Sequence, residues 1–206
     1  MTSAAATALW MAAARARESD RQDAIFHDPL AEVLAGADGF AVMRSMEDGL
    51  PPNPTLAIRT RYFDDQVRNL VAEHRIGQLV LLAAGMDTRA YRLALPSDLT
   101  CFEIDHPELV EMKAHRLATT TAEPTCRRIT LAADLTRPWT DNLTKAGFDP
   151  ARPAIFLAEG LLSYLTGDDV ASLLDAVTQL ATTNSHLLLD IAGNPRVDNA
   201  AMAEWV

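Results

Sequence analysis

The chain has 206 residues, of which 49% are hydrophobic and 22% are charged. That composition is typical of one globular domain, and it excludes collagen-like and disordered chains. The 28 acidic and 18 basic residues give a formal net charge of −10. Because a protein that binds nucleic acid through its phosphates needs a basic surface, we expect no nucleic-acid partner.

The sequence offers few signals for metal binding, disulfides or targeting. Cys101 and Cys126 both lie in apolar runs, so we expect buried free thiols and neither a disulfide nor a zinc site. The five histidines are dispersed, without the spacing of a metal site. Arg15 and Arg17 follow an alanine-rich stretch, the reverse of a signal peptide, and no apolar run reaches the ~18 residues of a membrane span. We therefore expect a cytoplasmic protein without a membrane partner.

The first part of the chain is predicted to be helical. Residues 4–18 are good helix formers. A second helix is expected to begin at Asp28 and Pro29, with the aspartate as N-cap and the proline in the first turn, and to end at Gly36. Pro and Gly residues at 49–54 predict a loop.

A long helix is predicted next, over residues 55–75, because its apolar residues recur at roughly helical spacing. Gly77 is expected to close this helix. Residues 1–76 would thus form a helical cap that contributes to substrate binding, in one compact unit with the remainder.

Residues 77–206 are predicted to form a Rossmann-like core. Five apolar runs have the length of strands, at residues 78–83, 99–104, 128–132, 154–158 and 186–191. Helical patterns separate most of them, at residues 107–119, 139–146 and 167–181, and a further apparent helix covers 197–206. This alternation predicts a doubly wound, mostly parallel α/β sheet with right-handed crossovers.

The ends of the first two predicted strands carry candidate ligand-binding residues, since ligands of such sheets bind beyond the carboxyl ends of the strands. A turn of small residues from Ala83 to Gly85 would let a ligand approach the backbone, although a glycine between strand and helix is also a common structural feature. Asp105 lies twenty residues beyond Gly85, the offset at which an acid reaches ribose hydroxyls. Capping of the helix that Pro107 opens is the alternative role of Asp105.

The next two strands also end in acids. Asp134 could accept a hydrogen bond from the exocyclic amine of an adenine while Leu135 packs on the ring. The alternative is that both residues belong to a solvated turn. Glu159 follows a wholly apolar strand and needs a cationic partner, either an ammonium group of a ligand or an arginine of the protein. Together with Asp105, these acids suit a nucleoside that carries an amino-acid tail better than they suit the pyrophosphate of a dinucleotide.

Five segments together carry a resemblance to a known family. With them the chain resembles the leucine carboxyl methyltransferase-like branch of the class I S-adenosylmethionine (SAM)-dependent methyltransferases, which includes polyketide O-methyltransferases and many actinobacterial proteins. The segments are IRTRYFDD at 58–65, QLVLLAAGMDTRAYRL at 78–93, FEIDHP at 102–107, ADL at 133–135 and AEGLLSYL at 158–165. Their combination is far more specific than any one glycine turn.

The resemblance implies SAM as cofactor and a role for each matching residue. These roles are Arg59 at the cofactor carboxylate, Ala83 to Gly85 at the methionine part, Asp105 at the ribose, Asp134 and Leu135 at the adenine, and Glu159 near the amino-acid end. Arg61 is the alternative to Arg59, and a pair with Asp64 or Asp65 is the structural role open to it.

The implied activity is methylation of a carboxylate or hydroxyl oxygen of a small molecule or polyketide-like metabolite by in-line transfer. Tyr164 is the candidate for a residue near the transferring methyl, whereas His106 and His115 are weaker candidates for a general base. An oligomer is possible.

Two departures from the family pattern point to a different class of function. Ala83 stands where the family has glycine. The family sheet has seven strands, so we expect this chain to lack the last two strands and much of the part that holds the acceptor. The alternative is therefore a non-catalytic, truncated methyltransferase-like protein that binds SAM weakly or not at all. An NAD-dependent oxidoreductase is disfavoured, because the turn lacks G-x-G-x-x-G.

Overall fold

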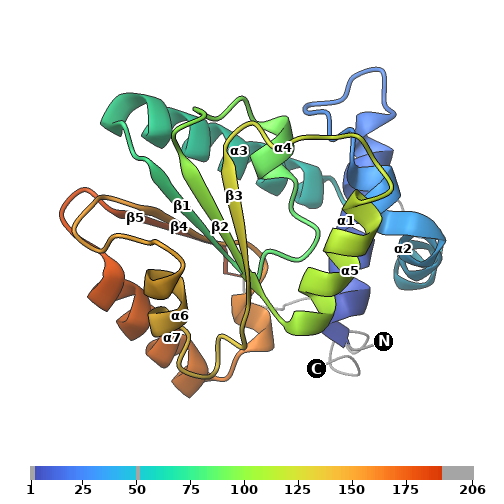
Figure 1. Ribbon diagram of the computed structural model, residues 1–206. Helices are drawn as coiled ribbons and strands as arrows, with labels where there is room; N and C mark the ends of the chain where they lie inside the picture. The colour runs from blue at the N-terminus through green and yellow to red at the C-terminus, as the bar shows by residue number, and fades with distance from the viewer. Residues whose placement is uncertain (1–2, 50–51, 192–206) are drawn as a thin grey trace.

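The computed structural model describes residues 3–49 and 52–191, which form a five-stranded sheet with helices on both faces and three helices before it (Figure 1). The elements in chain order are α1 (Ser3–Ser19), α2 (Ala31–Glu47), α3 (Pro54–His74), β1 (Gln78–Leu82), α4 (Arg89–Arg92), β2 (Thr100–Asp105), α5 (Pro107–Leu117), β3 (Arg127–Ala132), α6 (Thr140–Lys145), β4 (Ile155–Ala158), the 3₁₀ helix η1 (Leu162–Tyr164), α7 (Gly167–Leu180) and β5 (His186–Leu189). The helix expected at 197–206 lies outside the described residues.

The sheet is parallel throughout, with strand order β3-β2-β1-β4-β5. In the centre Leu79 of β1 lies opposite Cys101 of β2 and Ile155 of β4. Every residue of β1 and β4 is buried, as strands covered on both faces must be. The predicted α/β class is confirmed, and each of the five predicted strands is present with its bounds shifted by at most two residues.

Alternate residues of the strands build two separate cores. Leu79 and Leu81 face a core that also contains Phe63 and Val67 of α3. The intervening residue Val80 faces the opposite core, to which α6 and α7 contribute apolar side chains. Because side chains alternate along a strand, a continuous apolar run such as LVLL serves both faces.

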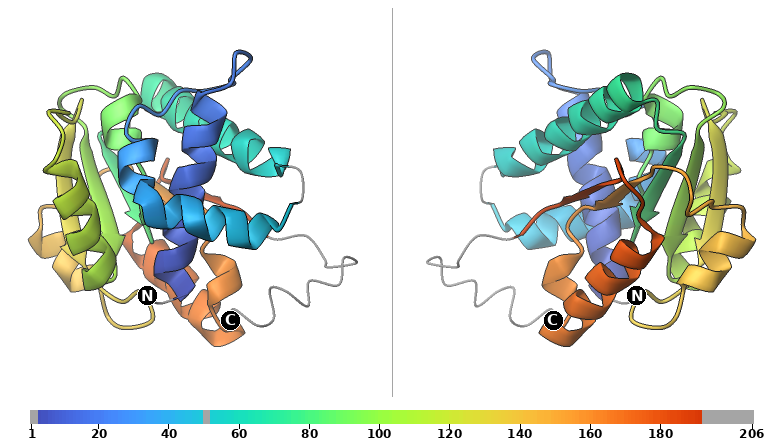
Figure 2. Two further views of the ribbon diagram at one scale, coloured as in Figure 1. Left: turned by 90° about the vertical axis from the view of Figure 1, so that its right-hand side faces the viewer. Right: turned by 90° about the vertical axis from the view of Figure 1, so that its left-hand side faces the viewer.

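Helices α1 and α2 cross and pack on each other, and α2 also contacts α5 (Figures 1 and 2). Leu9 of α1 and Leu34 of α2 are fully buried in a third apolar cluster, which extends to Met86 after β1 and to Leu109 of α5. The approach of α1 to α2 is so close that a Cβ on Gly39 would lie 2.7 Å from the carbonyl oxygen of Leu9. This cluster brings the N-terminal helices to the carboxyl end of the sheet.

The second predicted helix differs from the structure at both ends. It begins at Ala31, and Asp28 is not its N-cap, because the buried Asp28 side chain pairs with Arg15. Gly36 does not end the helix but kinks it, with φ at +57°, and the helix continues to Glu47. Pattern reasoning cannot separate a kink from an end, since a glycine with positive φ serves both.

The kink has a specific partner on the neighbouring helix. Arg116 of α5 donates to the carbonyl oxygens of Leu34 and Ala35, directly before the kink, at 2.5 and 2.6 Å. The end of α3 also differs from expectation: Arg75, in the left-handed conformation, closes it, and not Gly77. The two cysteines are free and buried, as predicted. Among the described residues no helix is long and apolar enough to cross a membrane.

We expect Gly36→Ala to destabilise the protein by about 1–2 kcal/mol, because alanine disfavours a left-handed φ and its Cβ would lie 3.1 Å from Nη1 of Arg116. Gly167→Ala at the start of α7 is the matched control. Its φ is ordinary and its Cβ would meet nothing within 4 Å, so it should be neutral or slightly stabilising. Denaturant midpoints measure both, and equal values would contradict the prediction.

Candidate functional site

The candidate site lies where the carboxyl ends of the parallel strands meet. The chain proceeds from β1 to β2 and β3 on one side and to β4 and β5 on the other, so β1 and β4 flank the point at which the strand order reverses. Ligands of open α/β sheets bind beside that point. The segments that follow β1, β2, β3, β4 and β5 are therefore the ones to compare with the predicted site residues.

The turn after β1 has an unusual backbone. Ala83 and Gly85 have φ values of +56° and +48°, a region that glycine tolerates and alanine does not favour. A Cβ on Gly85 would lie 3.2 Å from Cβ of Ala8 on α1, so this helix packs directly on the turn. Arg15, also on α1, donates to the carbonyl oxygen of Met86 at 2.5 Å. The N-terminal helix thus fixes the turn from outside the sheet.

Asp105 at the end of β2 contacts this turn. Its Oδ2 accepts from the backbone N–H of Gly85 at 2.5 Å, and its Oδ1 accepts from that of His106 at 2.7 Å. The capping alternative is wrong, because the N-cap residue of α5 is His106 and no side chain caps the helix. Burial raises the pKa of Asp105, and the two backbone hydrogen bonds oppose this rise. Each carboxylate oxygen retains a second lone pair for a ligand hydroxyl.

The segment after β3 is more open. Asp134 accepts from the backbone N–H and the hydroxyl of Thr136, at 2.9 and 2.7 Å, and these hydrogen bonds lower its pKa. Leu135 is half-buried and packs against the core that α6 and α7 share. In this structure Asp134 therefore has the turn geometry of its alternative role, with one carboxylate oxygen engaged.

Glu159 after β4 has two arginine partners. Its Oε1 accepts from Nε of Arg59 at 3.0 Å, and its Oε2 from Nη2 of Arg89 at 2.7 Å. Burial of Glu159 opposes ionisation, but the guanidiniums of Arg89 and Arg59 outweigh it and lower the pKa. The cationic partner that the sequence demanded is thus supplied by the protein.

The two candidate arginines of α3 lie in different surroundings. Arg59 reaches the strand ends, where Nη1 also pairs with Asp190 after β5 at 3.0 Å. Arg61 remains at the surface, 2.7 Å from Asp65, which is the structural role foreseen for it. Of the two, Arg59 alone is placed among the predicted site residues.

A larger set of ion pairs, which sequence reasoning missed, extends from these residues into the protein. It links Arg15, Asp28, Arg92, Asp64, Arg89, Asp87, Glu159, Arg59 and Asp190. In this described set five carboxylates face four guanidiniums, which leaves one negative charge. Arg89 is only 2% exposed and pairs with Asp64 of α3, Asp87 and Glu159. The one local signal is the segment DTRAYRL at 87–93, which places Arg89 and Arg92 three residues apart shortly after Asp87.

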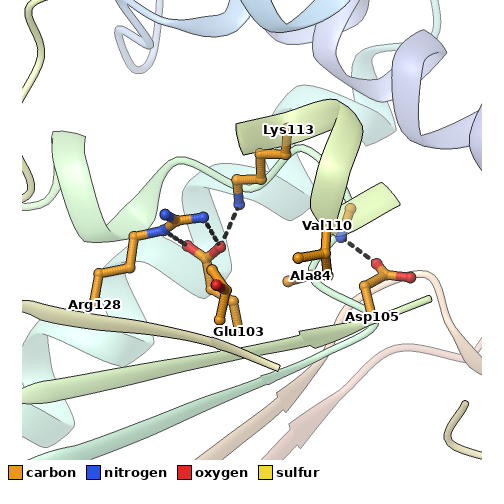
Figure 3. A pocket seen from close by; sticks show the side chains of 8 residues that line it. Ala84, Glu103, Asp105, Val110, Lys113 and Arg128 are labelled. Atoms are coloured by element: carbon orange, nitrogen blue, oxygen red, sulfur yellow. Dashed lines mark hydrogen bonds and ion pairs between the residues drawn. The ribbon is translucent and has the colours of Figure 1, made fainter. Parts of the chain in front are cut away.

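A second buried ion cluster lines the same small pocket as Asp105. Glu103 of β2 accepts from Lys113 of α5 at 2.8 Å and from Arg128 of β3 at 2.6 Å (Figure 3). Both cations point toward this carboxylate, and a small pocket lined by all three reaches Gly85 and Asp105. The cluster fastens α5 to β2, the strand that carries Asp105, and joins β2 to β3.

The candidate catalytic residue is accessible. Tyr164, in η1, is 40% exposed, close along the chain to Glu159 and Gly160. His106 and His115 are both exposed. Within residues 3–49 and 52–191 no group of three or more His, Cys, Asp or Glu side chains could hold a metal ion.

Sequence comparisons match the chain to one family. The family model for leucine carboxyl methyltransferase matches residues 8–178. Proteins named "Putative S-adenosyl-L-methionine-dependent methyltransferase" are similar. A protein from Parafrankia sp. is 40% identical, and the match covers 90% of this chain and 62% of that protein. One from Mycobacterium tuberculosis is 40% identical, with 93% of this chain and 60% of the relative covered. One from Mycolicibacterium smegmatis is 38% identical, with 98% of this chain and 70% of the relative covered. The chain spans about three fifths of the length of the first two relatives.

Comparison with solved structures shows the same fold. A DUF574 family protein from Streptomyces avermitilis has a TM-score of 0.60 at 16% identity, over 86% of this chain and 66% of its own. A "putative methyltransferase" from Thermobifida fusca has a TM-score of 0.58 at 23% identity, over 79% and 65%. At these identities the likeness concerns the fold alone.

We expect Ala83→Gly to stabilise the protein by about 0.5–1 kcal/mol, because relief of the left-handed strain exceeds the added chain entropy of glycine. Ala84→Gly is the matched control: its φ is not positive, so only the entropic cost remains and stability should fall. Chemical denaturation measures both variants. A loss of stability in Ala83→Gly would contradict the prediction.

The ion network predicts a loss of stability in acid. Burial opposes ionisation of Asp87, but Arg89 and Arg92 outweigh it and lower its pKa from 3.8 to about 2. The contribution of Asp87, about 2 kcal/mol, is therefore present above about pH 4 and lost as the pH falls to about 2. The free energy of unfolding of the wild type should fall across this window, and that of Asp87→Asn should fall less. Equal slopes in urea titrations would contradict this.

Proposed function

The chain belongs to the leucine carboxyl methyltransferase family, and we propose that it binds SAM at the carboxyl ends of β1 to β4 and transfers the methyl group to an oxygen of a small molecule. SAM consists of an adenine, a ribose, a sulfonium that carries the methyl group, and a zwitterionic amino-acid tail. Each of these parts has a counterpart among the strand-end residues.

One hydrogen bond carries the proposal, that between Asp105 and the backbone N–H of Gly85. It joins the acid after β2 to the turn after β1, so a diol bound by Asp105 would lie next to the backbone of that turn. A carboxylate that keeps free lone pairs suits the two vicinal hydroxyls of a ribose. The ribose and the methionine part of SAM would then be held at adjacent strand ends.

The remaining predicted residues suit the other parts of SAM. Arg59 and Glu159 present opposite charges 3.0 Å apart, as the carboxylate and ammonium of an amino acid require. Asp134 and Leu135 at the end of β3 provide an acceptor and an apolar surface for adenine. One uncompensated negative charge in the ion network also favours a ligand that carries a sulfonium.

Bound SAM would supply an electrophilic methyl group, so the task of the chain is to position the reactants and exclude water. Arg59, Asp105 and Glu159 would hold SAM so that its methyl group could pass to an acceptor oxygen, with the electron pair of the broken carbon–sulfur bond left on sulfur and, for a hydroxyl acceptor, the proton released to a base or to water. A carboxylate acceptor needs no base. We place Tyr164 near the transferring methyl, and we assign acceptor binding to the helices of residues 1–76, which reach the same end of the sheet through α1.

Titration calorimetry with S-adenosylhomocysteine tests cofactor binding. We expect wild-type binding, weakened about 10- to 100-fold in Asp105→Asn because a hydrogen bond to a charged group contributes about 1.5–3 kcal/mol. Asp98→Asn, at an exposed turn before β2, is the matched control and should bind as the wild type does. No heat with the wild type, or equal affinity in Asp105→Asn, would refute the proposed site.

Transfer of a labelled methyl group from SAM then separates an enzyme from a non-catalytic binding protein. Panels of small carboxylic acids and hydroxyl compounds test for O-methylation by mass spectrometry. Binding without any transfer would favour the non-catalytic alternative. Full turnover by Tyr164→Phe would remove Tyr164 from the site.

A further inference from the structure

Arg59 lies between two carboxylates from neighbouring strands. Its Nε is 3.0 Å from Oε1 of Glu159 after β4, and its Nη1 is 3.0 Å from Oδ2 of Asp190 after β5. The other oxygen of Asp190 accepts from the backbone N–H of Gly160 at 2.5 Å. Asp190 therefore holds both the guanidinium and the turn that carries Glu159.

Glu159 has a second support of its own. Arg89, 2% exposed, donates to Oε2 of Glu159 at 2.7 Å, on the opposite oxygen from Arg59. The four charges form the series Asp190, Arg59, Glu159, Arg89, in which the contact between Arg59 and Glu159 is the middle pair. If this pair separates, each member keeps one partner of opposite charge, which avoids the large cost of an unpaired charge.

The middle pair can accept an amino-acid zwitterion with no loss of charge compensation. A ligand carboxylate would replace Glu159 at Arg59, and a ligand ammonium would replace Arg59 at Glu159. One ion pair is lost and two are gained. The side chains of Arg59, Glu159 and Asp190 are 21%, 15% and 26% exposed, so the middle pair is accessible whereas Arg89 is not.

We propose that the ion pair between Arg59 and Glu159 opens to admit the amino-acid end of the cofactor, and that Asp190 is the positioning residue that holds Arg59 in place when it does. The inference rests on the proposed function. It assigns Asp190 to the amino-acid end alone, because the hydrogen bonds and ion pair found for this residue in the described part of the chain go to Arg59 and to the backbone of Gly160. Recognition of the adenosine part should not depend on it.

Two ligands separate this role from a structural one. S-adenosylhomocysteine carries the amino-acid end, and 5′-methylthioadenosine carries the same adenosine without it. In Asp190→Asn the amide oxygen can still accept from Gly160, but the charge opposite Arg59 is gone. By calorimetry we expect a loss of about tenfold in affinity for S-adenosylhomocysteine, for a partly exposed charged partner, and unchanged affinity for methylthioadenosine.

Two further variants complete the test. Asp65→Asn, on the exposed side of α3 and paired with Arg61, is the matched control and should bind both ligands as the wild type does. Arg59→Lys keeps the positive charge but loses the planar guanidinium that donates to Glu159 and Asp190 at once. Its affinity for S-adenosylhomocysteine should therefore also fall, while its affinity for methylthioadenosine should not. Circular dichroism checks that each variant is folded. If Asp190→Asn does not fold, the affinities of Arg59→Lys for the two ligands provide the same test.

The outcomes are distinct. Selective loss for S-adenosylhomocysteine supports the inference. Unchanged affinities, or an equal loss for both ligands, would overturn it while leaving the proposed function intact, provided that the wild type binds S-adenosylhomocysteine. A wild type that binds neither ligand would overturn the proposed function and this inference together.

Discussion

A guanidinium removed from water needs acidic partners and hydrogen-bond acceptors, and the arrangement of this protein depends on how Arg89 meets that requirement. Its three acidic partners come from α3, from the turn after β1 and from the end of β4. Those three segments are far apart in sequence, and burial makes any missing partner costly. The same contacts that satisfy Arg89 therefore fix the long helix α3 against the strand ends. Arg59, which α3 also carries, is placed at the ends of β4 and β5 as a consequence.

The sequence predicted the core of the fold well because its signals are local. Runs such as LVLL at 79–82 and IFLA at 155–158 indicate strands buried on both faces, and the intervening helices have their own periodicity. The ion network could not be predicted in this way, since nothing in the spacing of Asp28, Asp64 and Arg92 says that they meet. Gly36 shows the same limit at one residue: its identity suggests a positive φ, but not that the helix resumes after it and continues to Glu47.

For the candidate site, the sequence predicted which residues lie at the strand ends better than it predicted their hydrogen-bond and ion-pair partners. Asp105 and Gly85 follow strands as expected, and the hydrogen bond between them is the contact that their spacing made possible. Glu159 was expected to need a cation, and the sequence could not decide between a ligand and the protein. The structure supplies Arg59 and Arg89, and the two readings are compatible if one of the arginines can yield its place to a ligand. Ala83, which stands where the family has glycine, adopts a left-handed conformation, so the turn tolerates this strain.

The alanine-rich start of the chain, which as composition is uninformative, acquires a meaning from the contact between Ala8 and Gly85. A helix can lie against a turn of this kind only if the side chain between them is no larger than a methyl group. The short side chain at position 8 thus lets α1 pack on the turn after β1, and a single added carbon there would crowd Gly85 without changing any charge. Steric fit at this turn therefore depends on the helix that comes first in the chain, whereas the acids that pair with Arg59 follow the last two strands of the sheet.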